Sequence, residues 1–208
     1  MKNKTKIKIK IVILISGSGS NLKSILSEQQ HPKGCLYDLC DTLLVIGDRV
    51  ESLPGIEIAR SFGVKTSLVL RKNFKTKIAF EEELLAQILP LHPHYIILAG
   101  FMSILGKTML TPFKEKIINI HPADTKLYQG PHGYEWAYKN ALSSTKITVH
   151  YVDEGIDTGP IIAQHTVALP HIESLSLAQV IALGKEQENK FYPQVISNLF
   201  KESKLCVA

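Results

Sequence analysis

The first hundred residues repeat one pattern: a short apolar run, a turn that usually contains glycine, and a segment with helical spacing. Strands that alternate with helices in this way predict an α/β fold, with a doubly wound, mostly parallel sheet flanked by helices. The predicted strands are 8–15, 43–46, 66–70 and 95–99, and the predicted helices begin near 21 and span 57–62 and 78–89. Ligands bind such sheets beyond the carboxyl ends of the strands. We therefore expect segments 17–21, 47–49 and 100–102 to converge on one crevice.

The second half of the chain is less regular, and we expect residues 1–208 to form a single domain. A short apolar run at 117–120 leads into a polar, glycine-rich stretch at 122–133. Alternating apolar and polar residues predict a half-buried strand at 145–152. We also predict a strand at 161–168 and helices at 134–140 and 175–199, the second of them broken near Tyr192 and Pro193.

Composition narrows the classes of function. The net charge is +5 and the sequence pI is about 9.0, but the lysines are scattered, without an arginine-rich helix or a basic patch interleaved with aromatic residues. We therefore expect a small phosphorylated substrate rather than a nucleic-acid partner. No apolar run approaches about 18 residues, so no membrane partner is expected.

Cysteine and histidine usage points away from disulfides and metals. The three cysteines, Cys35, Cys40 and Cys206, are few for a chain of this size, which is typical of a reducing compartment such as the cytoplasm. We expect all three to be reduced and non-catalytic. Neither the cysteines nor the eight histidines have the spacing of metal ligands, so no metal site is predicted.

The turn at 17–21 reads Gly-Ser-Gly-Ser-Asn and joins the first predicted strand to a helix. Glycines let a ligand approach the backbone, and the N–H groups at a helix N-terminus bind anions. The dinucleotide-binding pattern GxGxxG fails because Leu22 occupies the third glycine position. The turn therefore indicates a phosphate the size of a mononucleotide's, although a tight turn without a ligand would have the same sequence.

A possible reaction centre follows the run at 117–120. Asn119 and His121 flank one residue at the end of a strand, so both side chains can project to the same side. An asparagine amide can donate to a developing oxyanion, and a histidine can transfer protons near neutral pH. Asp157 lies in a loop defined by two glycines and a proline, where a carboxylate could orient a histidine. Each residue alone could equally be a strand-end cap, a structural histidine or a solvated turn residue.

For two other polar residues, the local sequence predicts a structural or solvated role rather than a role in binding or catalysis. His150 lies inside an alternating strand, which is typical of a satisfied structural histidine. Glu188 lies among charged residues on a predicted helix, which is typical of a solvated face.

Taken together in order, these segments resemble the phosphoribosylglycinamide formyltransferase family. The matching segments are ILISGSGSNL at 13–22, LAGFM at 98–102, NIHP at 119–122, VHYV at 149–152 and IDTGP at 156–160. The resemblance spans about residues 10–200. It implies a Rossmann-like fold and transfer of a formyl group from 10-formyltetrahydrofolate, as co-substrate, to the amine of glycinamide ribonucleotide in purine biosynthesis. It implies no metal, and we expect a monomer or a homodimer.

The resemblance also assigns roles to residues that match the family's motifs. The N-terminal half would bind the nucleotide, and the C-terminal half would carry the catalytic and folate-binding groups. The implied catalytic residues are Asn119, His121 and Asp157. The implied acceptor-binding residues are Gly19, Ser20 and Asn21 for the phosphate and Glu188 for the ribose hydroxyls. The implied folate-binding residues are Met102, Ser103, Leu105, Glu154 and Thr158.

The residue types suit this chemistry. The amine would attack the formyl carbon and place negative charge on the formyl oxygen, which Asn119 and a protonated His121 could stabilise. Asp157 would favour the charged imidazole and hold its orientation. His121 or a bound water would move a proton from the amine to the leaving folate nitrogen.

The chain departs from the family's usual sequence near this centre. Residues 123–126 read Ala-Asp-Thr-Lys where the family usually has Ser-Leu-Leu-Pro, and Ser103 replaces an arginine of the folate wall. Segments 47–49 and 129–136 are also unusual. Two alternatives therefore stay open: a formyltransferase of the same fold that acts on another amine, such as an amino sugar nucleotide, and a catalytically silent nucleotide-binding homologue.

Overall fold

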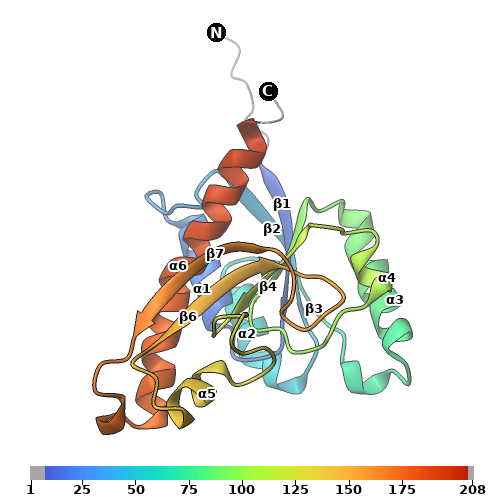
Figure 1. The fold of residues 1–208 in the computed structure, drawn as a ribbon. Coiled ribbons are helices and arrows are strands. Elements are labelled where there is room, and N and C mark those ends of the chain that lie inside the picture. Colours follow the sequence, from blue (N-terminus) through green and yellow to red (C-terminus); the bar gives the residue numbers. More distant parts are fainter. Residues whose placement is uncertain (1–7, 206–208) are drawn as a thin grey trace.

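A seven-stranded sheet forms the centre of the molecule, in the order β3-β2-β1-β4-β5-β6-β7 (Figure 1). The computed structural model describes residues 8–205, so Cys206 lies outside the described residues. The strands are β1 (Ile9–Ile15), β2 (Cys40–Gly47), β3 (Thr66–Leu68), β4 (Tyr95–Leu98), β5 (Ile117–His121), β6 (Ser144–Tyr151) and β7 (Ile161–Ala168). Strands β1 to β5 pair in parallel, whereas β6 and β7 pair antiparallel to their neighbours. The predicted doubly wound, mostly parallel sheet is therefore confirmed.

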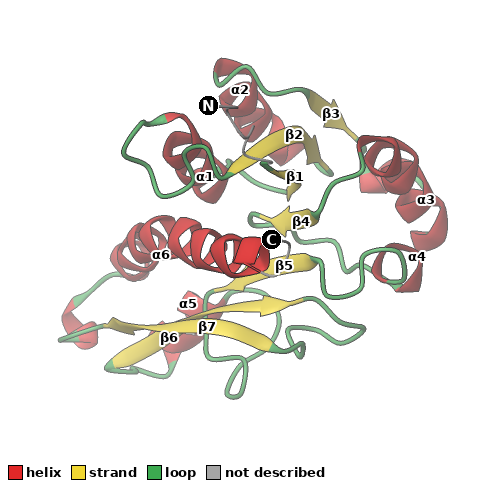
Figure 2. Cartoon of the chain, turned by 90° about the horizontal axis from the view of Figure 1, so that it is seen from above, coloured by secondary structure: helices red, strands yellow, loops and turns green. Residues whose placement is uncertain are grey.

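Helices cover both faces of the sheet, as Figure 2 shows from above. The α-helices are α1 (Ser20–Gln30), α2 (Leu53–Ser61), α3 (Lys77–Ile88), α4 (Lys107–Leu110), α5 (Gly133–Lys139) and α6 (Leu177–Leu205). Short 3₁₀ turns occupy Val50–Ser52, Arg71–Asn73, Leu89–Leu91 and Ile172–Ser174. Helices α3 and α4 pack on one face, and α1, α2, α5 and α6 pack on the other. This arrangement explains why the central strands are apolar on both sides.

Strand β1 shows how alternate residues form the two cores. Ile11 and Ile13 pack in one cluster with residues of α1 and α6. Val12 and Leu14 pack in the other with residues of α3. All four side chains are fully buried. A strand buried on both faces has a continuous apolar sequence, which is the pattern at 11–15.

The carboxyl ends of β1, β2 and β4 converge as expected. β1 pairs with both β2 and β4, so successive strands are added to one side of β1 up to β3 and to its other side from β4 onward. Ser16 N–H donates to the Gly100 carbonyl at 3.1 Å, and Ser16 Oγ accepts from the Met102 N–H at 2.7 Å. Asp48 N–H donates to the Ile15 carbonyl at 3.2 Å. The three turns thus form one edge of the sheet.

The prediction of a break in the last helix was wrong, because α6 continues from Leu177 to Leu205 through Pro193. A proline has no N–H to donate to the carbonyl four residues earlier, here that of Asn189. The Ser24 hydroxyl on α1 donates to that carbonyl instead. A neighbouring helix therefore satisfies the group that the proline leaves free.

Smaller differences concern element ends. The third strand ends at Leu68 rather than Leu70, and α2 begins at Leu53 rather than Glu57. The single turn of α4 was not predicted, because four residues are too few to show a helical period.

Candidate active site

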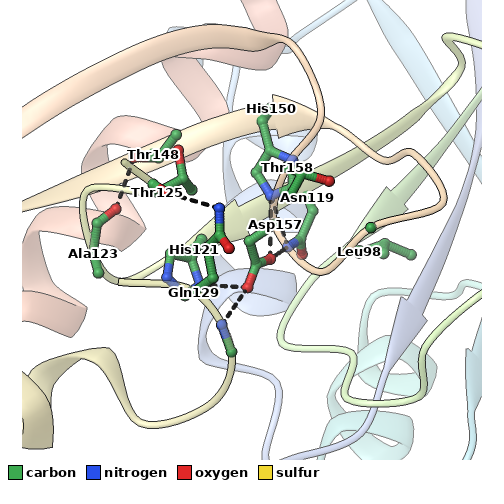
Figure 3. A network of polar contacts seen from close by, with 12 residues as sticks. Leu98, Asn119, His121, Ala123, Thr125, Gln129, Thr148, His150, Asp157 and Thr158 are labelled. Atoms are coloured by element: carbon green, nitrogen blue, oxygen red, sulfur yellow. Dashed lines mark hydrogen bonds and ion pairs between the residues drawn. The ribbon is translucent and has the colours of Figure 1, made fainter. Parts of the chain in front are cut away.

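A cavity of about 620 Å³ lies beyond the carboxyl ends of β4 and β5. Strand β5 supplies Asn119 and His121, two residues apart and both on the cavity wall. The loop after β6 supplies Asp157, and the turn after β4 supplies Gly100 and Phe101. Figure 3 shows Asp157 lying between Asn119 and His121. The fold thus brings together three residues that the sequence separates by up to 38 positions.

Asp157 is the centre of this arrangement. Its Oδ2 lies 3.2 Å from His121 Nδ1 and accepts from the Gly130 N–H at 2.9 Å. Its Oδ1 accepts from Asn119 Nδ2 at 3.3 Å. The carboxylate therefore joins β5 to the 122–133 loop.

The backbone of the Asp157 loop is unusual. Asp157 has a φ of 54°, a left-handed conformation that non-glycine residues adopt infrequently and that often marks functional sites. Asp153 Oδ1 accepts from the Gly155 N–H at 3.1 Å and from the Thr158 hydroxyl at 2.7 Å. At Gly159 a Cβ atom would lie 1.9 Å from the Tyr151 carbonyl oxygen, so only glycine fits there. These contacts fix the direction in which Asp157 points.

Both ring nitrogens of His121 face acceptor oxygens. Nδ1 faces Asp157, and Nε2 lies 3.0 Å from the Tyr128 carbonyl oxygen. Only the imidazolium can donate at both positions. Burial nevertheless lowers the pKa of His121 below its usual value of 6.5, and the Asp157 charge opposes that effect without cancelling it. The ring is thus placed to take up a proton and to release it readily.

The pKa of Asp157 itself stays below its usual 3.8. Burial raises this pKa, but the hydrogen bonds with His150 and the Gly130 N–H, together with the charges of His121 and His150, outweigh burial. Asp157 is therefore ionised at neutral pH and can stabilise a positive charge on His121.

His150 belongs to the same cluster, although its sequence context favoured a structural role. Its Nε2 lies 3.2 Å from Asn119 Nδ2 and 3.4 Å from Asp157 Oδ1. Its Nδ1 lies 2.8 Å from the Tyr151 carbonyl oxygen. His150 reaches this place because it pairs directly with Asn119 in the β5–β6 register. Only knowledge of that register could have predicted its position.

Three of the five predicted folate-binding residues line the cavity, namely Met102, Ser103 and Leu105. The other two are not on its wall. Glu154 is exposed and lies 3.7 Å from Lys107 Nζ, and the Thr158 hydroxyl is bonded within its own loop. Residues Asp153, Gly155 and Ile156 line the cavity from this loop instead.

The predicted acceptor-binding residues form a second group, outside the cavity wall. Gly19 has a φ of 82° and precedes α1, which begins at Ser20. Asn21 Nδ2 donates to Glu188 Oε2 at 2.8 Å, so the predicted phosphate turn and the predicted ribose-binding residue are in direct contact. Glu188 is buried rather than solvated.

Two departures from the family pattern make internal contacts. The Ser103 hydroxyl donates to Asp48 Oδ2 at 2.5 Å, which ties the turn after β4 to the end of β2. Asp124 accepts from Lys146 Nζ at 2.7 Å and from Gln164 Nε2 at 3.2 Å. Burial raises the pKa of Asp124, but the hydrogen bonds from Lys146, the Lys126 N–H and Gln164, together with the charge of Lys146, outweigh burial, so the pKa lies below 3.8.

Asp124 also supports the loop that holds the cavity residues. Its carbonyl accepts from the Tyr128 N–H at 2.9 Å, and Tyr128 carries the carbonyl that His121 faces. The same loop supplies the Gly130 N–H to Asp157. The ion pair with Lys146 therefore anchors the backbone on which the His121–Asp157 geometry depends.

Within residues 8–205, no group of three or more histidine, cysteine, aspartate or glutamate side chains is placed to hold a metal ion. Across the same range, no helix has the length and apolar character needed to cross a membrane.

Known proteins resemble this chain over most of its length. A family model described as formyl transferase matches residues 9–196. A phosphoribosylglycinamide formyltransferase of Bacillus subtilis is 37% identical over 145 residues, which are 69% of this chain and 73% of that protein. A trifunctional purine biosynthetic protein of Drosophila pseudoobscura is 33% identical over 78% of this chain, which corresponds to 12% of the longer protein. The crystal structure of a phosphoribosylglycinamide formyltransferase from Bacillus halodurans superposes with a TM-score of 0.84 at 30% identity, covering 93% of this chain and 96% of that one.

Proposed function

The chain belongs to the phosphoribosylglycinamide formyltransferase family of formyl transferases, and from this premise we propose that it formylates the amine of glycinamide ribonucleotide in purine biosynthesis. The formyl donor is 10-formyltetrahydrofolate, the reaction needs no metal, and it takes place in the cytoplasm. The observation that carries the proposal is the contact of Asp157 with both His121 and Asn119 on the wall of one cavity.

Asn119 stabilises the developing oxyanion. Attack of the substrate amine on the formyl carbon places negative charge on the formyl oxygen, and Asn119 Nδ2 is a donor on the cavity wall. One such donor contributes about 3–4 kcal/mol in comparable sites. Before the substrate arrives, the two N–H groups of Asn119 face His150 and Asp157, and one of these contacts gives way to the formyl oxygen in the reaction.

His121 carries the proton. Attack leaves the amine nitrogen positively charged, and His121 removes a proton from it, directly or through a water molecule. The resulting imidazolium donates from Nδ1 to Asp157, while Nε2, which faces the Tyr128 carbonyl in this structure, exchanges that contact for the substrates or a bridging water. His121 then gives the proton to the folate nitrogen as the bond from that nitrogen to the formyl carbon breaks. The reaction thus produces a formamide and tetrahydrofolate without net proton uptake by the protein.

Two groups of residues bind the substrates. The turn at Gly19, Ser20 and Asn21 binds the acceptor phosphate at the N-terminus of α1, and Glu188 binds the ribose hydroxyls. Met102, Ser103 and Leu105 form the folate wall, with Glu154 and Thr158 stabilising the loop on the opposite side.

The geometry favours this acceptor over another amine. The departures from the family sequence at Ser103 and Asp124 are the features that would favour another acceptor. The Ser103 hydroxyl is engaged by Asp48, and Asp124 is engaged by Lys146 and Gln164. Neither departure therefore offers a free polar group for a different acceptor. The intact contacts of His121 and Asp157 argue against a silent homologue.

The decisive test is turnover. The purified protein is incubated with 10-formyltetrahydrofolate and glycinamide ribonucleotide, and release of tetrahydrofolate is followed. We expect turnover that depends on the acceptor. Turnover with an amino sugar nucleotide but not with glycinamide ribonucleotide would contradict the proposed acceptor. Folate binding by calorimetry without any turnover would identify a silent homologue.

A further inference from the structure

A buried polar cluster connects three helices on the face of the sheet that carries the phosphate turn. Its centre is Glu188 on α6, whose side chain is almost inaccessible. The Tyr134 hydroxyl on α5 donates to Glu188 Oε1 at 2.7 Å, and Asn21 Nδ2 on α1 donates to Glu188 Oε2 at 2.8 Å. The cluster therefore links α5, which follows the 122–133 loop, to the turn at 19–21.

The ring of Tyr134 packs directly against α6 at a glycine. A Cβ atom at Gly184 would lie 2.1 Å from Tyr134 Cζ, so the ring occupies the space that glycine leaves on α6. Gly184 lies one helical turn before Glu188, which brings the hydroxyl to the carboxylate. The tyrosine is itself buried. Its hydroxyl is thus directed at Glu188 by shape as well as by the hydrogen bond.

The cluster has unused hydrogen-bond acceptors. Each oxygen of an ionised carboxylate can accept two hydrogen bonds, and each Glu188 oxygen receives one. Because Glu188 draws the nitrogen of the Asn21 amide toward itself, Asn21 Oδ1 points elsewhere, and it has no partner within residues 8–205. A buried acceptor without a donor is costly unless a ligand supplies one. Sugar hydroxyls are donors of the required kind.

We propose that Tyr134 is a positioning residue for the phosphorylated acceptor. It holds the Glu188 carboxylate, and through it the Asn21 amide, so that both accept hydrogen bonds from the hydroxyls of the sugar whose phosphate binds at the 19–21 turn. This inference rests on the proposed function for the identity of the acceptor, but the binding of a sugar phosphate can be measured without turnover.

The principal test compares two probes, ribose 5-phosphate and 2-deoxyribose 5-phosphate, by calorimetry. For the wild-type protein, we expect the ribose compound to bind more tightly. In Tyr134→Phe, the dissociation constant for ribose 5-phosphate should rise about 10-fold, as for the loss of a hydrogen bond to a charged group. The constant for the 2-deoxy compound should change less than about 3-fold, because that probe lacks a hydroxyl that the positioned groups recognise.

The matched control is Tyr138→Phe, on the same helix. The Tyr138 hydroxyl makes no hydrogen bond within the described part of the chain, so this variant should bind both probes like wild type. An equal loss of affinity for the two probes in Tyr134→Phe, or no loss, would overturn the proposal. If Tyr134→Phe does not fold, Tyr134→Met keeps an apolar side chain of similar length and allows the same comparison.

Kinetics give a second readout that a purely structural role would not change. In Tyr134→Phe, we expect KM for glycinamide ribonucleotide to rise about 10-fold, while kcat and KM for the folate stay within about 2-fold. A wild-type protein that binds ribose 5-phosphate but does not turn over would contradict the proposed function alone. A fall in kcat with unchanged KM would contradict the positioning role alone.

The pH dependence should also shift. Burial raises the pKa of Glu188, and the hydrogen bonds from Tyr134 and Asn21 and the charge of Lys185 counteract it. Tyr192 on α6 also interacts with Glu188, whose charge adds to burial in raising the tyrosine's pKa. Loss of the Tyr134 donor should therefore move the acid limb of kcat/KM for the acceptor to higher pH. A limb that stays in place would count against the proposal.

Discussion

His121 owes its chemistry to competing effects at one residue. Burial favours the neutral ring, whereas Asp157 and the Tyr128 carbonyl favour the charged one. The outcome is a histidine whose charged form faces two acceptor oxygens but whose pKa is lowered by burial, which suits a group that takes a proton from one substrate and gives it to the other.

Removal of this side chain should be severe. We expect His121→Ala to lower kcat at least about 100-fold, because both proton transfer and the ordering of Asp157 are lost. The measurement is steady-state kinetics with both substrates, and exposed His171→Ala is the control. Near-wild-type kcat in His121→Ala would remove the catalytic assignment.

Asp157 permits a prediction with a definite direction in pH. Asp157→Asn removes the charge that raises the pKa of His121, so burial should lower that pKa further. Since the neutral ring is the base, the acid limb of the kcat–pH profile should move to lower pH, and kcat on the plateau should fall. A shift of this limb to higher pH would be incompatible with the pairing of His121 and Asp157.

At the scale of elements, α6 depends on α1 to remain continuous. Pro193 leaves the Asn189 carbonyl without its helical donor, and Ser24 replaces that donor. The same helix places Glu188 and the fully buried Tyr192, whose hydroxyl donates to the Leu98 and Ile118 carbonyls at 3.1 Å. The helix thus joins β4 and β5 to the turn at 19–21.

Ser24→Ala tests this dependence. Loss of the hydroxyl leaves a part-buried carbonyl without its donor, and we expect the free energy of unfolding to fall by about 1–2 kcal/mol. Urea denaturation measures it. Ser27→Ala is the control on the same helix, because the Ser27 hydroxyl makes no hydrogen bond within residues 8–205. Equal stability of the two variants would mean that the helix tolerates the proline unaided.

For the whole molecule, buried ionisable groups set the dependence of stability on pH. The pKa values of His94 and His121 are lowered mainly by burial, so the unfolded chain binds protons more readily than the folded one as the pH falls below about 6.5. The pKa values of Asp124 and Asp157 are also lowered. The stabilisation that these two carboxylates contribute is present above about pH 3.8. It is lost as the pH falls through the pKa values that they have in the folded protein. Glu188 has a raised pKa, so its contribution to the free energy of unfolding increases as the pH falls.

We therefore expect the free energy of unfolding to decrease when the pH falls from 7.5 to 5.5. His121 contributes at most about 1.4 kcal/mol per pH unit to this slope. Urea midpoints at several pH values test the expectation, and His121→Gln should reduce the slope. An unchanged slope in that variant would show that His121 does not carry the effect.

Local patterns determined the sheet, the crevice and three residues of the site. Apolar periodicity and turn residues act over a few positions, so the succession of strands along the chain and the turns that follow them could be predicted from the sequence. Asn119 and His121 followed from their spacing at a strand end, and Asp157 from a loop that glycines define. Their assignment as one group depended on the order of motifs along the whole chain.

Tertiary structure decided the contacts between distant positions. His150 joined the site because the β5–β6 register places it opposite Asn119. Glu188 became a buried group because Asn21, 167 positions away, and Tyr134 surround it. Pro193 did not end α6, because Ser24, more than 160 positions away, satisfies the free carbonyl. Local sequence encodes periodicity and turns, but the environment of a buried polar group is set by partners that only the folded chain brings together.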